Sequence, residues 1–239
     1  MLEVLDVECW ELADASGLAS GSLKTLKLHS ELPDDGSPIL IAGLAEVVER
    51  NPGLLNILLN RPEPAALLKI GQLKSLESLQ LSGADDLENL DFLESSPVIG
   101  LCLFECPNLK DVDVLRGNVR IGKVRMYKCG IENLDGLIAT AGLEELDISG
   151  CHQLQRIDGL SKSTSLKSLR LEYCKSLNSL KGISGCAVLE TLDVTDAPEV
   201  SDISVVYKLL PLESLRLPKQ FSPQLPQLKN AHPDAFISF

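Results

Sequence analysis

The chain is poor in aromatic residues, which make up 4% of its 239 residues, and it is short of basic ones. Its 34 acidic residues outnumber 22 basic residues and give a formal net charge of −12. Affinity for nucleic acid and for anionic membranes comes from clustered lysine and arginine, so we expect neither as a partner. The scarcity of rings predicts a core filled by leucine, isoleucine and valine.

Signals for export or membrane insertion are also missing from the sequence. It has no run of 18 apolar residues, and its first residues are acidic rather than positively charged. The seven cysteines are an odd number and four of them recur at one spacing, which favours reduced thiols over a disulfide framework. We therefore expect a cytoplasmic (intracellular) protein, provided that no upstream segment has been removed.

The common catalytic and metal-binding motifs G-x-S-x-G, C-x-x-C and H-E-x-x-H do not occur. Residues 117–124 nearly match the phosphate-binding loop G-x-x-x-x-G-K-[ST], but Val124 replaces the hydroxyl residue that would meet magnesium. His29 should face Glu8 with Cys9 close by, yet nothing supplies an oxyanion site for a nucleophile and base. We predict no enzyme, no cofactor and no metal site.

What the sequence does have is a repeat. An L-x-x-L-x-L block begins at residue 143, returns at 166 and opens again at 189. A period of 22 or 23 residues over most of the chain indicates stacked coils, so we predict one solenoid over residues 1–239. The ten predicted blocks begin at Leu2, Leu23, Leu54, Leu76, Val98, Ile121, Leu143, Leu166, Leu189 and Leu212.

One copy is longer than the others, because 31 residues separate the block starts at Leu23 and Leu54. Residues 51–53 (Asn-Pro-Gly) would end a helix in this copy, on the outer side of the coil. In the shorter copies, residues 134–137 (LDGL) and 157–160 (IDGL) predict 3₁₀-like turns instead. The apolar face of the predicted helix consists of Ile41, Leu44, Ala45 and Val48.

The two ends of the repeat differ from its middle. The first block begins at Leu2 and leaves an apolar edge open, which predicts either a fragment of a longer protein or an edge that pairs with another chain. Residues 218–239 contain four prolines, which cannot sustain another regular coil, so we predict a C-terminal cap there. Its apolar residues should cover the last coil: Phe221, Leu225, Leu228, Phe236 and Phe239.

These blocks resemble the leucine-rich repeat family over residues 2 to about 217. The form L-x-x-L-x-L-S-G-C-x-x-L, followed by x-x-L-D-G-L, is similar to short repeats of trypanosomatid, internalin-like and plant resistance proteins. The long copy is similar to the ribonuclease-inhibitor type. The resemblance implies an α/β solenoid curved like a horseshoe. Its parallel β-sheet would form the concave face, with short helices, 3₁₀ turns and loops on the convex face. Members are mostly protein-binding scaffolds.

Cysteine stands where the family often has asparagine, at Cys106, Cys129, Cys151 and Cys174. In some members such a cysteine packs in the turn and bonds weakly to backbone. Stacked coils would place these residues roughly 5 Å apart in a line. Zinc needs four converging ligands and a disulfide needs side chains that face each other, so the arrangement favours a structural row of thiols.

In each block the residues between the leucines should point away from the core. On adjacent strands, charges at the fifth position would form a ladder. The ladder either neutralises itself, as we favour for Asp193 and Arg216, or forms a polar docking surface. The fifth residues of the last five blocks alternate in sign: Arg125, Asp147, Arg170, Asp193 and Arg216.

At the seventh position, Phe104 and Tyr127 become neighbours on the exposed sheet. Exposed aromatics beside arginine are typical of binding hot spots, although single apolar residues are also common on any protein surface. If there is one docking centre, we expect it here. The candidate partner-binding residues are Phe104, Glu105, Lys123, Arg125, Tyr127, Lys128, Asp147, Arg170 and Tyr173.

Three hypotheses about function follow. The first is a non-catalytic scaffold that binds a protein or peptide, with an acidic or mixed contact patch, on its concave sheet. The second is a regulatory or sensing fragment of a larger enzyme or effector. The third is structural self-assembly through the open N-terminal edge.

Overall fold

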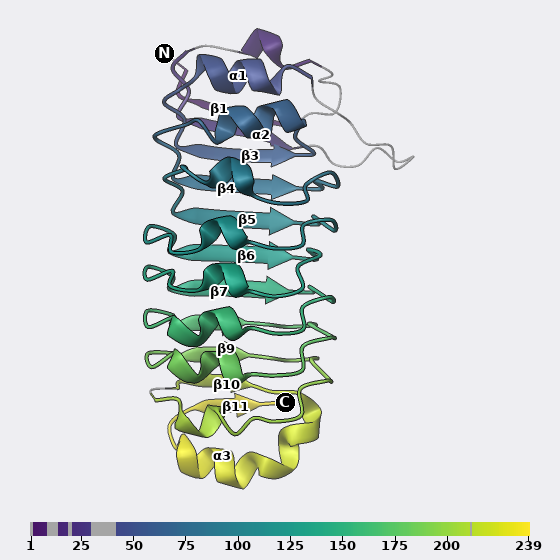
Figure 1. Cartoon of the computed structure of the whole chain (residues 1–239), viewed down its shortest axis with the longest axis vertical. Helices are drawn as coiled ribbons and strands as arrows, with labels where there is room; N and C mark the ends of the chain where they lie inside the picture. Colours follow the sequence, from purple (N-terminus) through teal and green to yellow (C-terminus); the bar gives the residue numbers. More distant parts are fainter. Residues whose placement is uncertain (1, 9–13, 19–20, 30–41, 211) are drawn as a thin grey trace.

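The computed structural model describes residues 2–8, 14–18, 21–29, 42–210 and 212–239. Within these residues the strands form one parallel sheet and follow one another in sequence order. Figure 1 shows them stacked in a single column. Its eleven described strands are β1 (Val4–Glu8), β2 (Thr25–His29), β3 (Asn56–Asn60), β4 (Ser78–Ser82), β5 (Gly100–Phe104), β6 (Lys123–Tyr127), β7 (Glu145–Ser149), β8 (Ser168–Arg170), β9 (Thr191–Asp193), β10 (Ser214–Arg216) and β11 (Phe236–Ser238).

Each strand from β1 to β10 begins two residues after one of the predicted block starts. The period of the leucines therefore sets the register of the whole sheet. Within β7, for example, Leu146 and Ile148 are fully buried, whereas Asp147 and Ser149 lie on the opposite face. The prediction of an aliphatic core is confirmed, since Phe221 is the only deeply buried aromatic side chain among the described residues.

Helical segments connect the strands and lie over one face of the sheet (Figure 1). None of the described helices is both long and apolar enough to cross a membrane. The α-helices are α1 (Leu44–Arg50), α2 (Pro64–Ile70) and α3 (Leu225–Ala231). The 3₁₀ segments are η1 (Ser16–Leu18), η2 (Asp91–Leu93), η3 (Asp113–Leu115), η4 (Asp135–Leu137), η5 (Asp158–Lys162), η6 (Lys181–Gly185), η7 (Val206–Lys208) and η8 (Lys219–Gln224).

The helix predicted for the long second copy is α1, and the turns predicted at LDGL and IDGL are η4 and η5. Leu44 and Val48 are buried as expected, whereas Ile41 lies outside the described residues. Asn51 ends the helix and is itself buried. Its amide accepts a hydrogen bond from Leu23 N–H at 3.0 Å and donates one to the Val47 carbonyl at 2.8 Å, so it joins the helix to the sheet.

The C-terminal tail differs from the prediction. It does form a further coil, in which η8 and α3 lead to β11, and β11 pairs in parallel with β10. The prolines permit this because Pro226 falls in the first turn of α3, where a helix tolerates proline. Phe221 and Leu228 are buried as predicted, but Phe236 is 62% exposed.

The cysteine row is buried in the core, with each described thiol free. The Cys174 thiol donates to the Ile148 carbonyl of the preceding coil at 2.9 Å. Burial raises its pKa to about 12, so the thiol stays protonated at neutral pH. No group of three or more His, Cys, Asp or Glu side chains in the described ranges is arranged to hold a metal ion.

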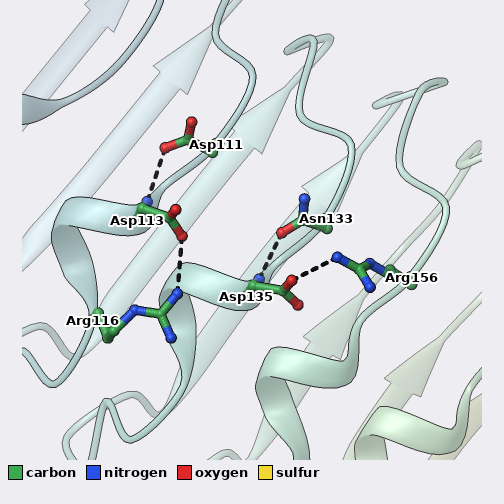
Figure 2. Close-up of polar contacts among 6 residues, drawn as sticks. All are labelled: Asp111, Asp113, Arg116, Asn133, Asp135 and Arg156. Carbon is green, nitrogen blue, oxygen red and sulfur yellow. Dashed lines mark hydrogen bonds and ion pairs between the residues drawn. The ribbon is translucent and has the colours of Figure 1, made fainter.

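On the helical side of the molecule, a polar residue two positions ahead caps the start of several 3₁₀ segments (Figure 2). Asp111 Oδ1 accepts the Asp113 N–H at 3.1 Å, and Asn133 Oδ1 accepts the Asp135 N–H at 2.9 Å. In the next coil this position is Arg156, whose guanidinium instead contacts the Asp135 carboxylate at 2.7 Å. Asp111 and Asn133 therefore cap their own coils, whereas Arg156 connects its coil to the preceding one.

Candidate functional site

The sheet has one face that the helical segments do not cover, which we call the open face. It carries the third, fifth and seventh residues of each block. Strand pairing places Cys102, Arg125, Asp147 and Arg170 side by side along the fifth position. The same register pairs Phe104 with Tyr127 and Tyr127 with Ser149. The open face corresponds to the concave sheet of the prediction.

On the open face of β3 and β4, the third, fifth and seventh residues of the block are all uncharged, whereas β1 and β2 carry the Asp6–Lys27 ion pair. A hollow of about 430 Å³ crosses β1 to β4 there. Apart from Lys27 at one side, its walls consist of small polar and apolar residues: Val4, Thr25, Asn56, Ile57, Leu58, Ser78 and Gln80. Hydroxyl and amide groups of this kind hydrogen-bond without selecting for charge.

The centre of the open face holds the predicted aromatic pair. Phe104 is half-buried and Tyr127 is 41% exposed. A shallow depression of about 270 Å³ lies against both rings, and Arg125, Ser149 and Arg170 also line it. The structure thus brings five of the nine predicted residues to one depression: Phe104, Arg125, Tyr127, Asp147 and Arg170.

The two predicted lysines have acidic partners within the molecule. Lys123 Nζ lies 2.5 Å from Glu145 Oε2, and this hydrogen bond holds the pKa of the Glu145 carboxyl below its usual value. Lys128 Nζ lies 3.1 Å from Glu105 Oε1, which raises the pKa of Lys128, and 5.0 Å from the centre of the Tyr127 ring. Neither lysine therefore offers an unpaired charge to a partner.

The arginines of the ladder differ in their distance to the nearest carboxylate oxygen. Arg216 Nη1 lies 3.4 Å from Asp193 Oδ2, and Asp193 is only 3% exposed, so mutual neutralisation describes this pair well. The closest carboxylate oxygens to Arg125 and Arg170 are at 3.8 and 4.0 Å. These are beyond hydrogen-bonding distance. The predicted ladder is thus hydrogen-bonded at its C-terminal end, whereas the two central arginines make only longer ion pairs.

The strand ends form a second row of interest. In seven consecutive coils the eighth residue has a positive φ, namely Arg61, Gly83, Glu105, Lys128, Gly150, Tyr173 and Asp196. Glycine adopts this backbone conformation at little cost, but for each of the five other residues it costs about 1–3 kcal/mol of conformational free energy. Glu105, Lys128 and Tyr173 belong to the predicted set. Such strain in natural proteins gathers at functional sites, which makes this rim part of the candidate surface.

Tyr173 is not a direct neighbour of the aromatic pair. It lies on the rim, 49% exposed, two coils from Tyr127, and its carbonyl oxygen is 2.8 Å from His152 Nδ1. Gly150 occupies the rim between the two tyrosines. A β-carbon at Gly150 would stand 3.4 Å from Lys128 Cγ and 3.6 Å from the Tyr127 ring, which are ordinary contacts, so it is the positive φ that favours glycine there.

Comparison with solved structures shows what this arrangement is similar to. The leucine-rich repeat domain of the type III effector XopL has 17% identity and a TM-score of 0.59, over 81% of this chain and 70% of that one. Internalin C2 from Listeria monocytogenes has 19% identity and a TM-score of 0.58, over 70% of this chain and 72% of that one. The plant peptide hormone receptor RGFR1, in complex with RGF2, has 15% identity and a TM-score of 0.60, over 99% of this chain and 43% of that one. No protein-family model and no curated protein matches the sequence.

The fold is a leucine-rich repeat solenoid. The predicted parallel sheet and the short helical returns are confirmed by this likeness and by the open eleven-stranded sheet of the described residues. At identities of 15% to 19%, the likeness concerns the fold of the chain. It does not extend to a particular partner.

Two signals that looked catalytic have structural explanations in the leucine-rich repeat. Lys123 and Val124, in the segment that resembles a phosphate loop, belong to β6 and do not open a helix. His29 does face Glu8 in the strand register, as predicted. Its ring, however, contacts another carboxylate, because Nε2 lies 2.6 Å from Asp6 Oδ1. That contact, and then Lys27, lowers the pKa of Asp6. Cys9 lies outside the described residues.

Sequence reasoning missed Glu145 and Ser149. Glu145 stands opposite Lys123 in the register and takes up its charge. Ser149 donates a hydrogen bond to Asp147 Oδ1 at 2.5 Å and so takes up one oxygen of that carboxylate. The signal that would have found Glu145 is its third position in the block, because third positions face the same side as fifth and seventh ones.

Proposed function

We propose that the chain is a non-catalytic scaffold that binds a protein or peptide on the open face of its leucine-rich repeat. One observation carries the proposal: Phe104 and Tyr127 stand side by side above a depression that two arginines also line. Aromatic residues and arginine dominate the energetics of protein interfaces. The centre of the docking surface would be β5 to β8.

The mechanism is pre-organisation. Tyr127 lies between Met126 and Cys129, whose side chains are buried in the core, and its strand is paired on both sides. The strand therefore fixes the direction in which the Tyr127 side chain leaves the sheet before a partner arrives. Ordering a flexible side chain on binding costs about 0.5–1.5 kcal/mol, so a rigid sheet loses less free energy on docking. The strained backbone of Glu105, Lys128 and Tyr173 supports the same view.

A peptide or an extended protein segment fits the open face. One protein of similar fold is a plant peptide hormone receptor, solved in complex with RGF2. On the present chain, the depression of about 270 Å³ has room for single side chains rather than for a small-molecule cofactor. The hollow over β1 to β4, where hydroxyl and amide side chains adjoin Lys27, would accommodate backbone amides of the same partner.

The proposal is tested by affinity capture from a native lysate. Wild type is compared with the triple variant Phe104→Ala/Arg125→Glu/Tyr127→Ala, after circular dichroism has shown that both are folded. We expect a specific partner to bind the wild type and to be lost from the triple variant. An unchanged set of partners would contradict docking on the central open face.

A matched control uses the opposite side of the same coils. Arg116 and Arg156 lie in the row of Figure 2, where each pairs with an aspartate of the helical side. The double variant Arg116→Glu/Arg156→Glu changes the net charge by more than the triple variant does. It should nevertheless retain the partner. Loss of the partner from both variants would indicate a general charge effect and not a docking site.

A second proposal concerns β1, which pairs with β2 alone in the described sheet. Its first residue, Val4, is 54% exposed, and Leu2 just before the strand is 52% exposed. An open strand edge with apolar side chains can pair with a second copy of the chain. Light scattering over a range of concentrations would show dimers that the Val4→Glu variant does not form. A strictly monomeric wild type would contradict self-association.

We also propose that the protein acts inside the cell, in a reducing compartment. The six described cysteines are free, and all but Cys102 are buried in the core. Thiols persist in the cytosol, whereas the secretory route oxidises them. Cell fractionation would place the protein with cytosolic markers. Recovery with secreted proteins would contradict this.

A further inference from the structure

The cations of the open face divide into two classes by their distance to a carboxylate. Lys27, Lys123 and Arg216 lie 3.0, 2.5 and 3.4 Å from an acidic oxygen of a neighbouring strand. Arg125 and Arg170 stand at 3.8 and 4.0 Å. In the part of the chain that the structure describes, these two guanidinium groups donate no hydrogen bond to a protein acceptor. Each carries five N–H donors in a planar fork.

Arg125 and Arg170 lack a hydrogen-bond acceptor because the neighbouring carboxylates already have other partners. Glu145, the carboxylate nearest Arg125, is held by Lys123. Asp147, which stands between the two arginines in the register, accepts a hydrogen bond from the Ser149 hydroxyl at 2.5 Å. Both acids therefore spend part of their hydrogen-bonding capacity on other residues. The arginines keep their charge and lack an acceptor.

The two arginines also share one location. Both line the depression that Phe104 and Tyr127 border. One strand separates them, so their α-carbons are roughly 10 Å apart. This gap is wide enough for one carboxylate that accepts a hydrogen bond from a guanidinium on each side, at about 2.8 Å per bond.

We propose that Arg125 and Arg170 together hold one carboxylate of the partner, namely the side chain of an aspartate or glutamate in the docked segment. The inference rests on the proposed docking function and assigns its specificity. A carboxylate fits better than a phosphate. Glu145 and Asp147 adjoin the arginines, and they would repel a dianion more strongly than a monoanion.

The test uses a library of random decapeptides that are acetylated at the N-terminus and amidated at the C-terminus, so that the only carboxylates are side chains. Peptides are selected on the wild-type protein. The best binder is then resynthesised with glutamate, glutamine or phosphoserine at the position where acids are enriched. Binding of each version is measured by calorimetry to wild type, to Arg125→Gln/Arg170→Gln and to the control Arg156→Gln.

We expect selection to fix an acidic residue at one position. On the wild type and on Arg156→Gln, replacing that glutamate by glutamine should weaken binding about tenfold to a hundredfold, as loss of a charged hydrogen-bonded pair does. On Arg125→Gln/Arg170→Gln the same replacement should have little effect, because the acceptor site is already gone. Tighter binding of the phosphoserine peptide would overturn the assignment of a carboxylate.

Other outcomes separate this inference from the proposed function. Suppose that the selected peptides no longer bind Phe104→Ala/Tyr127→Ala. If they then show no acidic preference, or bind Arg125→Gln/Arg170→Gln as well as wild type, only the role of the arginine pair is overturned. Peptides that bind without regard to Phe104 and Tyr127, or no selected peptide at all, would overturn docking on the central open face together with the arginine pair.

Discussion

Gly159 packs against the carbonyl group of Leu134 in the preceding coil, so closely that a β-carbon there would stand 1.8 Å from the carbonyl oxygen. Gly136 and Gly182 occupy the same place in the coils on either side, at 2.1 and 2.0 Å from a carbonyl oxygen. The glycine in the D-G-L pattern is therefore required for close approach of two backbones. Only a residue without a side chain allows the coils to stack at this spacing.

Substituting Gly159→Ala should lower the free energy of unfolding by about 1–3 kcal/mol or more, because the clash is with backbone and cannot be relieved by a rotamer change. Chemical denaturation measures the change. Gly122→Ala is the matched control, since its β-carbon would meet the nearest atom at 3.7 Å, an ordinary contact. Equal stability of the two variants would contradict the packing explanation.

The caps of the 3₁₀ segments should contribute measurably to stability (Figure 2). Asn133→Ala removes the acceptor of the Asp135 N–H and should cost about 0.5–2 kcal/mol, as loss of a helix cap does. Arg156→Ala removes only a largely exposed ion pair to Asp135 and should cost less than about 1 kcal/mol. Urea denaturation of both variants gives the comparison. The reverse order would mean that the ion pair, and not the cap, holds this turn.

The left-handed rim predicts an unusual preference at Tyr173. Glycine tolerates its backbone conformation and alanine does not. Tyr173→Gly should therefore be more stable than Tyr173→Ala by about 1 kcal/mol. At Ser168, in the extended strand β8, the order should invert and alanine should be the more stable. Thermal unfolding of the four variants tests this. Alanine equal to glycine at Tyr173 would argue against strain on the rim.

The protonation of Glu172 should contribute to the pH dependence of stability. Burial, and next the nearby Asp193 carboxylate, raise the pKa of this carboxyl above its ordinary value of 4.5. The folded state then binds the proton more tightly than the unfolded state, so this group's contribution is most favourable below pH 4.5 and declines as the pH rises through the raised pKa. Glu172→Gln should stabilise the protein at pH 7 by about 0.2–1 kcal/mol and have little effect at low pH.

Glu145→Gln is the control for that experiment and should behave in the opposite way. The hydrogen bond from Lys123 lowers the pKa of Glu145, so its contribution is present above pH 4.5 and is lost as the pH falls. The variant should be slightly less stable than wild type at pH 7. Denaturation curves at pH 4 and pH 7 decide the signs, and a loss of stability at pH 7 in both variants would contradict this assignment.

The sequence predicted the strands well, because the leucine period is imposed by burial on one face of each coil. Leu146 and Ile148 illustrate this, because a shift of the strand register by one residue would expose both side chains. The extra strand Phe236–Ser238 was missed, because proline was read as a breaker although Pro226 falls where helices accept it. Helix α2 was also not predicted; it begins with Pro64 and has only seven residues.

The candidate site was only partly accessible to sequence reasoning. Register alone brought Phe104 and Tyr127 together, since both occupy the seventh position. Which charged groups also form hydrogen bonds depends on side-chain conformations that register does not determine. Lys123 turns to Glu145 and Asp147 accepts from Ser149, so Arg125 is left without an acceptor. Sequence spacing had predicted alternating charges and had favoured neutralisation for Asp193 and Arg216, which is the pair that the structure brings together.

Cys102 provides the most direct test of docking on the open face. It lies in the register between Gln80 and Arg125, and it is the one described cysteine that is not buried. The measurement is the rate at which a maleimide modifies Cys102 in a Cys9→Ser protein, with and without the captured partner. If the partner docks on the open face, modification slows in proportion to the fraction bound, and protein already modified no longer binds. Modification at an unchanged rate in the saturated complex would contradict docking at the centre of the sheet.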